Sequence, residues 1–239
     1  FNEVDFGYNS DRQILHKLDF TVEPGKTLAI VGPSGSGKST IGRMLFRFYD
    51  VWDGGIEIDG QDLRNVTQSS LREAIGIVPQ DTVLFNDTIA YNIAYGRPNA
   101  SREEVIEAAK LAQIHAFIMD LPEGYDTRVG ERGLKLSGGE RQRVSIARTI
   151  LKDPSILLFD EATSALDTDT ESAIQASLAA VSRDRTTLVI AHRLSTVVDA
   201  DEIIVLDKGR IAERGSHQAL LERDGVYAHM WHSQQEADE

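Results

Sequence analysis

The sequence contains no cysteine, which excludes disulfide bonds and metal sites built from thiolates. Basic residues are also scarce: 25 Lys and Arg stand against 38 Asp and Glu, and the formal net charge is −13. We therefore expect no dominant basic surface for nucleic acid, although a local basic pocket is compatible with this balance. No apolar run approaches the roughly 18 residues of a membrane-spanning helix, and the first residues do not read as a signal peptide.

The chain has 239 residues, of which 41 % are hydrophobic and 26 % charged, as is usual for a globular protein. This length can bury one substantial core, or a core with an additional lobe. The chain opens on Phe1 within a strand-like pattern, so we expect it to be a piece of a longer polypeptide. Residues 234–239 read as a solvated tail.

Two glycines five positions apart, followed by Lys-Ser, define a phosphate-binding loop at Gly32–Ser39. Glycines allow the backbone to form a concave nest of N–H groups, and the following helix adds its positive N-terminal end. Lys38 can place its charge between the β- and γ-phosphates, and the Ser39 hydroxyl suits Mg²⁺. The alternative is a flexible Gly/Ser turn. A β-compatible run before the loop, 27–31, and a helix-like run after it, 40–46, favour phosphate binding.

Strand-like and helix-like runs alternate along most of the chain, which indicates an α/β layer fold with a parallel sheet. We expect strands at residues 1–8, 18–22, 27–31, 56–58, 75–78, 156–159, 186–190, 202–206 and 210–212. Residues 88–152 are mostly helical and read as an inserted lobe, with helices at about 101–112 and 137–151; a further helix is expected at 168–181.

Several polar residues follow expected strands directly. Asp160 and Glu161 end an apolar run that is typical of a central parallel strand, His192 follows the run 186–190, and Gln80 follows the run 75–78. Ligands of doubly wound sheets bind beyond the carboxyl ends of the strands. We therefore expect Asp160 to coordinate Mg²⁺ and Glu161 to orient the attacking water. The alternatives are an acidic pair that caps the next segment and a structural histidine.

A second anion-binding helix start is expected at Leu136–Glu140. Ser137 can cap the helix, and Gly138 with Gly139 exposes its first N–H groups. The alternative is a pair of glycines that only tightens a loop. One triphosphate does not need two such sites in one chain, so a phosphate held by a partner would use the second.

Taken in order, these motifs resemble the nucleotide-binding domain of ABC transporters over essentially the whole chain. The matching motifs are the Walker A loop (32–39), the Q-loop (Gln80), the signature (136–140), the Walker B strand (156–161), the D-loop (164–167), the switch histidine (His192) and the adenine-stacking aromatic (Tyr8). Without the resemblance, Tyr8 would be interpreted as an ordinary sheet residue. One position departs from the family pattern, because the usual signature Gln is Glu140 here, which puts the role of that side chain in doubt.

The resemblance implies Mg²⁺-dependent ATP hydrolysis with three sets of residues. The catalytic set is Lys38, Glu161 and His192. The metal set is Ser39, Gln80 and Asp160. The ATP-contacting set is Tyr8, Gly32, Ser34, Gly35, Ser36, Gly37, Lys38, Ser39, Thr40, Gln80, Ser137, Gly138, Gly139 and Glu140.

The implied fold is a P-loop NTPase core with a mixed, mostly parallel sheet, an N-terminal antiparallel part and an inserted helical subdomain. The division would be 1–87 and 153–239 for the core and 88–152 for the helical subdomain. The resemblance also implies a head-to-tail dimer with ATP between one subunit's Walker A loop and the other's signature. The dimer would drive a transmembrane domain from the cytoplasmic or mitochondrial matrix face, with this part of the chain itself soluble.

Further stretches are similar to exporters. Residues 129–133 and 191–196 resemble exporter sequence, and 85–89, 114–115 and 130–135 resemble half-transporters of mitochondria and their bacterial relatives. Those relatives export glutathione-linked, iron–sulfur-related or heavy-metal compounds. The main alternative function is a soluble ABC-type ATPase of DNA repair or translation. A P-loop kinase or GTPase and a catalytically inactive regulatory module are weaker alternatives, because the chain has a signature helix together with Glu161 and His192.

Overall fold

A six-stranded sheet forms the centre of the computed structural model, which describes residues 1–131, 133–160 and 168–238. The strand order is β11-β10-β3-β9-β8-β7, and only β11 runs antiparallel to its neighbour. The strands are β3 (Thr27–Val31), β7 (Ile75–Val78), β8 (Ile156–Asp160), β9 (Thr186–Ile190), β10 (Glu202–Asp207) and β11 (Arg210–Gly215). The mixed, mostly parallel α/β sheet is thus confirmed. Three of these strands, β3, β7 and β9, have the boundaries that the apolar runs predict.

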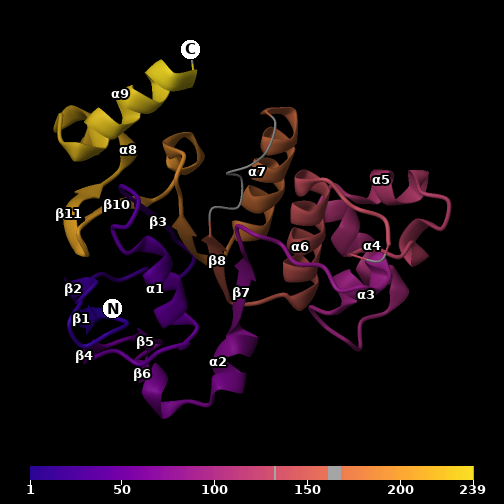
Figure 1. The fold of residues 1–239 in the computed structure, drawn as a ribbon, viewed down its shortest axis with the longest axis horizontal. Helices are drawn as coiled ribbons and strands as arrows, with labels where there is room; N and C mark the ends of the chain where they lie inside the picture. The colour runs from indigo at the N-terminus through magenta and orange to yellow at the C-terminus, as the bar shows by residue number, and fades with distance from the viewer. Residues whose placement is uncertain (132, 161–167, 239) are drawn as a thin grey trace.

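A smaller antiparallel sheet of order β2-β1-β4 adjoins the phosphate-loop helix (Figure 1). Its strands are β1 (Asn2–Phe6), β2 (Leu15–Leu18) and β4 (Asp53–Gly55), and β5 (Glu57–Ile58) pairs with β6 (Gln61–Asp62). The strand expected at 18–22 is wrong, because Leu18 pairs with Val4 and Leu15 with Phe6. The pairing with β1 therefore ends where the strand was expected to begin.

Helices cover both faces of the large sheet. They are α1 (Lys38–Leu45), α2 (Gln68–Ala74), α7 (Thr168–Ser182), α8 (His217–Glu222) and α9 (Val226–Asp238), with 3-10 turns η1 (Leu63–Asn65) and η3 (Leu194–Val197). One buried cluster joins α1 to β1 and β2, and another joins β3 and β10 to η3, α8 and α9. None of the helices within the described ranges is long and apolar enough to cross a bilayer.

The helical segment contains α3 (Ile89–Ala94), α4 (Arg102–Leu111), α5 (His115–Asp120), η2 (Gly124–Asp126) and α6 (Gly138–Lys152), which gather at one end of the molecule (Figure 1). The helix expected at about 101–112 begins with a capping box of Ser101 and Glu104, in which the Glu104 N–H donates to Ser101 Oγ at 3.2 Å. The hydrophobic cluster of these helices continues onto the sheet at Val78 and Phe159. The division of the chain at residues 88 and 152 stays a prediction.

Residues 234–238, which the sequence analysis reads as a solvated tail, are the last part of helix α9 (Val226–Asp238). Gln235 and Glu236 are exposed, as that prediction requires, but the segment is helical. The start of the helix is packed on the sheet, where Tyr227 and Ala228 are fully buried. Gln234 on this helix makes two hydrogen bonds to the segment that follows β9.

Candidate functional site

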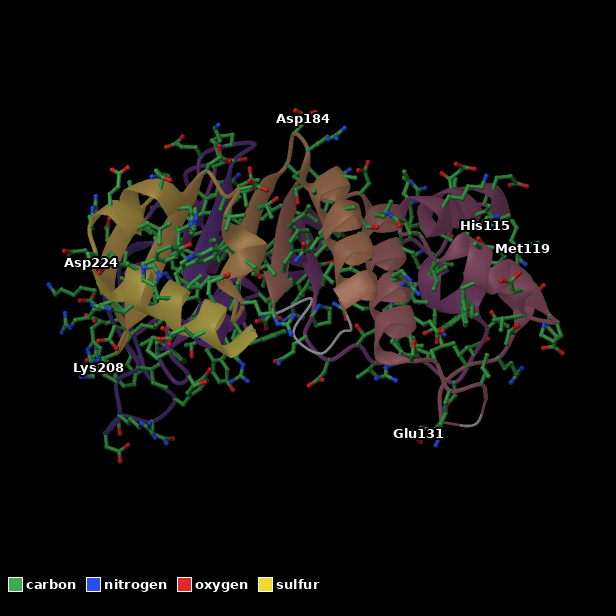
Figure 2. All side chains as sticks on the ribbon, turned by 90° about the horizontal axis from the view of Figure 1, so that it is seen from above. His115, Met119, Glu131, Asp184, Lys208 and Asp224 are labelled. Atoms are coloured by element: carbon green, nitrogen blue, oxygen red, sulfur yellow. The ribbon has the colours of Figure 1, made fainter. Side chains whose placement is uncertain are left out.

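The candidate site lies at the edge where the parallel strands end. Ile190 of β9 pairs with Ile30 of β3 on one side and with Asp160 of β8 on the other. With a strand spacing of about 4.8 Å, the phosphate loop and Asp160 begin about 10 Å apart, and the segment with His192 starts between them. Figure 2 shows Asp184, in the turn before β9, at the opposite edge of the sheet from Lys208, in the turn after β10. The carboxyl-end edge is therefore the Lys208 side of the molecule.

The phosphate loop needs glycine at defined backbone positions. Gly32 has a φ of +148°, and a Cβ there would lie 2.1 Å from the carbonyl oxygen of Leu206. Gly37 has a φ of +108° and is the N-cap of α1. In contrast, a Cβ at Gly35 would meet no atom of the described residues within 4 Å, so among these residues the loop is tightly packed at its start and open at its tip.

The first turn of α1 directs its polar groups into the loop. Lys38 is 5 % exposed, and its Nζ donates to the carbonyl oxygens of Gly32 at 2.7 Å and Pro33 at 3.0 Å. The N-cap makes no side-chain cap bond, which leaves first-turn N–H groups for an anion. Ser39 is exposed and Ser34 lies at the open tip of the loop. These features fit a phosphate-binding loop, and the contacts of its residues with a triphosphate stay a prediction.

The backbone and the side chain of Ser36 each bear on how this loop could bind phosphate. Its carbonyl oxygen accepts from the N–H of Gly209 at 2.9 Å, which ties the loop to the turn between β10 and β11. Within the described part of the chain its Oγ is buried with no hydrogen-bond partner. An unsatisfied hydroxyl in the loop fits a site that a ligand completes.

Tyr8 lies beyond the end of β1, so it is not a sheet residue. Its hydroxyl is 3.2 Å from Thr40 Oγ1, and Arg43 donates to it at 2.9 Å. The ring stands edge-on to Phe6 and Tyr49, each with a centroid distance of 5.2 Å, and it is 37 % exposed. An exposed aromatic face beside the start of α1 is available for stacking on a base, and its contact with adenine stays a prediction.

The residues expected to hold Mg²⁺ supply oxygen donors, as that ion prefers. Asp160 ends β8 half-buried, Gln80 is exposed two residues after β7, and Ser39 is exposed in the first turn of α1. The described ranges contain no group of three or more His, Asp or Glu that would form a closed metal cage. One carboxylate with a hydroxyl and an amide fits an ion that takes its other ligands from phosphates and water.

The signature segment begins α6. Ser137 Oγ accepts from the N–H of Glu140 at 3.3 Å, and the Glu140 carboxylate accepts from the N–H of Ser137 at 2.6 Å. Because Ser137 Oγ serves as acceptor in this capping box, its hydroxyl hydrogen can still be donated to an anion. Gly138 and Gly139 form the first two residues of the helix. The expected capped helix start is therefore present, and anion binding there stays a prediction.

The two candidate anion sites lie on different elements. Helix α1 packs on β8 and β9, whereas α6 packs on α3, α4, α7 and β7. The phosphate loop thus belongs to the sheet and the signature to the helical segment.

Two glutamines that the sequence analysis did not single out hold parts of this site. Gln142 is 4 % exposed on α6, donates to the carbonyl oxygen of Pro79 at 3.1 Å and accepts from Thr82 Oγ1 at 2.9 Å, on either side of Gln80. Gln234 accepts a hydrogen bond from the N–H of Leu194 and donates one to the carbonyl oxygen of His192, the two residues that flank Arg193. The one signal that could have identified Gln142 is a polar residue on the buried face of the expected helix 137–151.

Glu161 and the D-loop residues 164–167 lie outside the described residues. A cavity of about 530 Å³ lies between α7 and the segment after β9, and the exposed His192 lines it.

Comparison with known proteins identifies the family. The family model described as ABC transporter matches residues 15–164, more than half of the chain. The chain belongs to the ABC transporter family. It carries the ATPase domain of that family, and the alternative of a soluble ATPase of DNA repair or translation is not favoured.

Three individual ABC transporters have sequences that are very similar to this chain. The ATM1-type heavy metal exporter of Novosphingobium aromaticivorans is 68 % identical over 231 residues, which covers 97 % of this chain and 38 % of that protein. The human ATP-binding cassette sub-family B member 6 is 66 % identical over 239 residues, covering 100 % and 28 %. The heavy metal tolerance protein of Schizosaccharomyces pombe is 59 % identical over 235 residues, covering 98 % and 28 %.

One solved structure, described as a bacterial Atm1-family ABC exporter with ATP bound, matches with a TM-score of 0.93 at 67 % identity. The match covers 98 % of this chain and 41 % of that one. The chain therefore spans well under half the length of the relatives it matches. The resemblance to exporter-type half-transporters is confirmed at the level of the ATPase domain.

Proposed function

We propose that the chain binds ATP with Mg²⁺, hydrolyses it, and thereby powers an exporter of the Atm1 type. The observation that carries this proposal is the sheet edge. Four parallel strands, β3, β9, β8 and β7, deliver a phosphate loop, His192, Asp160 and Gln80 to one side of the molecule. A purely regulatory nucleotide site does not require a histidine and a carboxylate at that edge.

In the proposed reaction, water attacks the γ-phosphorus of ATP, the bond from that phosphorus to the β–γ bridging oxygen breaks, and ADP and phosphate form. Lys38 and the loop N–H groups hold the phosphates and offset their charge. Glu161 orients the water and takes up its proton, and His192 donates a hydrogen bond to the γ-phosphate. Ser39, Gln80 and Asp160 would hold Mg²⁺, which neutralises charge on the β- and γ-phosphates when bound.

The partner for hydrolysis is a second copy of the same or a similar domain. Each chain has a phosphate loop on α1 and a capped helix start on α6, packed on different elements. Head-to-tail pairing uses both: the loop of one copy binds ATP, and Ser137, Gly138 and Gly139 of the other close over the γ-phosphate. ATP then joins the two copies, and hydrolysis releases them.

A transmembrane domain of the same transporter is the second partner, and an aromatic cluster on the helical segment is its docking surface. Phe85, Tyr91 and Tyr95 are 40 %, 46 % and 53 % exposed, and the Phe85 and Tyr95 rings lie 4.5 Å apart. Arg148 lies 5.8 Å from each of these two rings and donates to the carbonyl oxygen of Asn92. Exposed rings held in place in this way are typical of an interface.

The relatives support a transmembrane domain as the partner that docks on this aromatic cluster. They carry a large part of their length outside the region that this chain matches, and two of them are described as exporters. We place the chain on the cytoplasmic or mitochondrial matrix face of the membrane, where ATP is available. The cargo that we propose is a heavy-metal compound or a glutathione-linked one, on the strength of the relatives' names and the sequence resemblance.

Glu161→Gln tests this function directly. We expect the variant to bind ATP as the wild type does, to lose at least about 100-fold in turnover, and to accumulate as an ATP-bound dimer. Phosphate release and light scattering with size exclusion measure these quantities, and Glu123→Gln on the exposed surface is the matched control. Turnover at the wild-type rate in Glu161→Gln would show that Glu161 does not orient the attacking water. A wild type that neither hydrolyses ATP nor dimerises with it would refute the proposed function.

A further inference from the structure

The C-terminal helix α9 holds the segment that carries His192 through one side chain. Gln234 Nε2 donates to the carbonyl oxygen of His192 at 2.7 Å, and Gln234 Oε1 accepts from the N–H of Leu194 at 2.8 Å. A single amide thus satisfies two backbone groups that flank Arg193. This pairing is the geometry that one strand offers another, supplied here by a side chain.

The two bonds add to other anchors of this segment, in which the carbonyl oxygen of Arg193 accepts from the N–H of Thr196 at 3.3 Å and from Thr196 Oγ1 at 2.7 Å. Before His192, the N–H of Ala191 donates to the carbonyl oxygen of Ile30 at 3.1 Å. After it, Leu194 is buried and begins η3. His192 and Arg193 are exposed between these anchors. The amide of Gln234 therefore restrains the His192 carbonyl group and the Leu194 N–H directly, together with these neighbouring anchors.

Helix α9 is itself firmly placed, so it can serve as a support. Tyr227 is fully buried, and its hydroxyl is 2.7 Å from His217 Nδ1. Burial raises the pKa of Tyr227 to about 12, so the hydroxyl stays protonated. The N–H groups of Val226 and Tyr227 both donate to the carboxylate of Glu213. The start of the helix is thus anchored on β11, two turns before Gln234.

We propose that Gln234 is a positioning residue for His192, so that α9 sets the geometry of the γ-phosphate contact from outside the shared motifs. The proposal rests on the function proposed above, in which His192 donates to the γ-phosphate. A hydrogen-bonding side chain that is misplaced by about 1 Å loses much of its effect on a transferring phosphoryl group. Loss of the two bonds lets the His192 backbone shift, without changing the phosphate loop that binds ATP.

Gln234→Met is the decisive variant, because Met keeps the length and packing of the side chain but can neither donate nor accept strongly. We expect kcat for ATP hydrolysis to fall about tenfold, while KM and the Kd for a fluorescent ATP analogue change less than about twofold. Amide exchange at Leu194 should become about tenfold faster, with the phosphate loop unchanged. Gln235→Met, on the exposed neighbouring residue, is the matched control and should behave as the wild type.

Gln234→Glu separates positioning from a general loss of stability. It keeps an acceptor for the Leu194 N–H but loses the donor to the His192 carbonyl oxygen, so Leu194 exchange should remain closer to the wild type while kcat still falls. An unchanged kcat in Gln234→Met overturns the proposal. So does a drop in melting temperature with faster exchange throughout the chain in both variants.

The two proposals fail in different ways. A wild-type chain without ATPase activity refutes the proposed function. In that case the exchange rate at Leu194 in Gln234→Met still decides whether Gln234 holds the segment, and unchanged exchange rejects that role.

Discussion

The Glu140 carboxylate and the Ser137 hydroxyl cap each other's backbone N–H groups at the start of the signature helix. Glu140 stands where the family pattern has Gln, and the structure gives its side chain a local task that either residue can perform, since both offer an acceptor oxygen. A contact between Glu140 and a ribose hydroxyl stays a prediction. A carboxylate at this position also places negative charge where a partner's γ-phosphate would approach.

Two substitutions at Glu140 separate these effects. We expect Glu140→Ala to lower the free energy of unfolding by about 1 kcal/mol, because the N–H of Ser137 loses its acceptor. Glu140→Gln keeps the acceptor and removes the charge, so stability should change little and ATP-dependent dimerisation should tighten about 2- to 5-fold. Urea unfolding and light scattering measure the two quantities. Equal stability of Glu140→Ala and wild type would show that the cap contributes nothing.

The sequence predicted the parts of this molecule whose signals are local. The apolar runs correctly predicted the first and last residues of β3, β7 and β9. The polar residues that follow these strands lie at one edge of the sheet. Pairing was harder: β2 lies at 15–18 because Leu15 and Leu18 face Phe6 and Val4. That register depends on the partner strand, which an alternation pattern does not reveal.

Long-range contacts explain the other differences. Residues 234–238 look polar enough for an irregular tail, yet they continue helix α9, whose start is buried against the sheet at Tyr227. Gln234 then reaches a segment 40 residues earlier, and Gln142 reaches one 60 residues earlier. No spacing rule links such residues, because tertiary packing alone brings them together.

Gly32 and Gly35 form a matched pair for testing the phosphate loop without nucleotide. Gly32→Ala would place its Cβ 2.1 Å from a backbone oxygen, so we expect a loss of at least about 3 kcal/mol in the free energy of unfolding. Gly35→Ala would meet no atom within 4 Å in the described part of the chain, so we expect only the strain of its φ of +78°, about 1–2 kcal/mol. Denaturant unfolding of the two variants gives the comparison. A smaller loss for Gly32→Ala than for Gly35→Ala would contradict the packing of the loop.

Tyr8 offers its ring and its hydroxyl to different neighbours, so two variants assign its role. Tyr8→Phe removes the bonds from Arg43 and Thr40 but keeps the ring, and ATP affinity should stay within about twofold. Tyr8→Ala removes the stacking face and should weaken ATP binding about tenfold. Titration with a fluorescent ATP analogue measures both. If Phe and Ala weaken binding equally, the hydroxyl rather than the ring contacts the nucleotide.

Asp201 gives stability a predictable dependence on pH. Its carboxylate accepts from Lys26 Nζ at 2.7 Å and from the N–H of Thr27 at 2.8 Å, and these bonds hold the pKa of Asp201 below its usual 3.8. A lowered folded pKa stabilises the fold above pH 3.8, and this contribution is lost as pH falls through the folded value. Because both charged side chains are well exposed, we expect the effect to be small.

Asp201→Asn isolates this contribution. The variant should unfold at a lower urea concentration than the wild type at pH 7, and the difference should shrink below pH 3.8. Asp199→Asn, on a nearby exposed residue, is the control and should follow the wild type at both pH values. A difference that grows as the pH falls would contradict the assigned direction of the pKa shift.

The central claim is that two copies share each ATP, and the absence of cysteine allows a clean measurement of it. Ser34→Cys marks the exposed tip of the phosphate loop and Ser137→Cys marks the exposed start of α6, each in a Glu161→Gln background. A short bismaleimide should link the two variants when they are mixed with ATP, and should link neither variant to itself. Cross-linking between identical variants, or no ATP-dependent linkage in the mixture, would contradict head-to-tail sharing of the nucleotide.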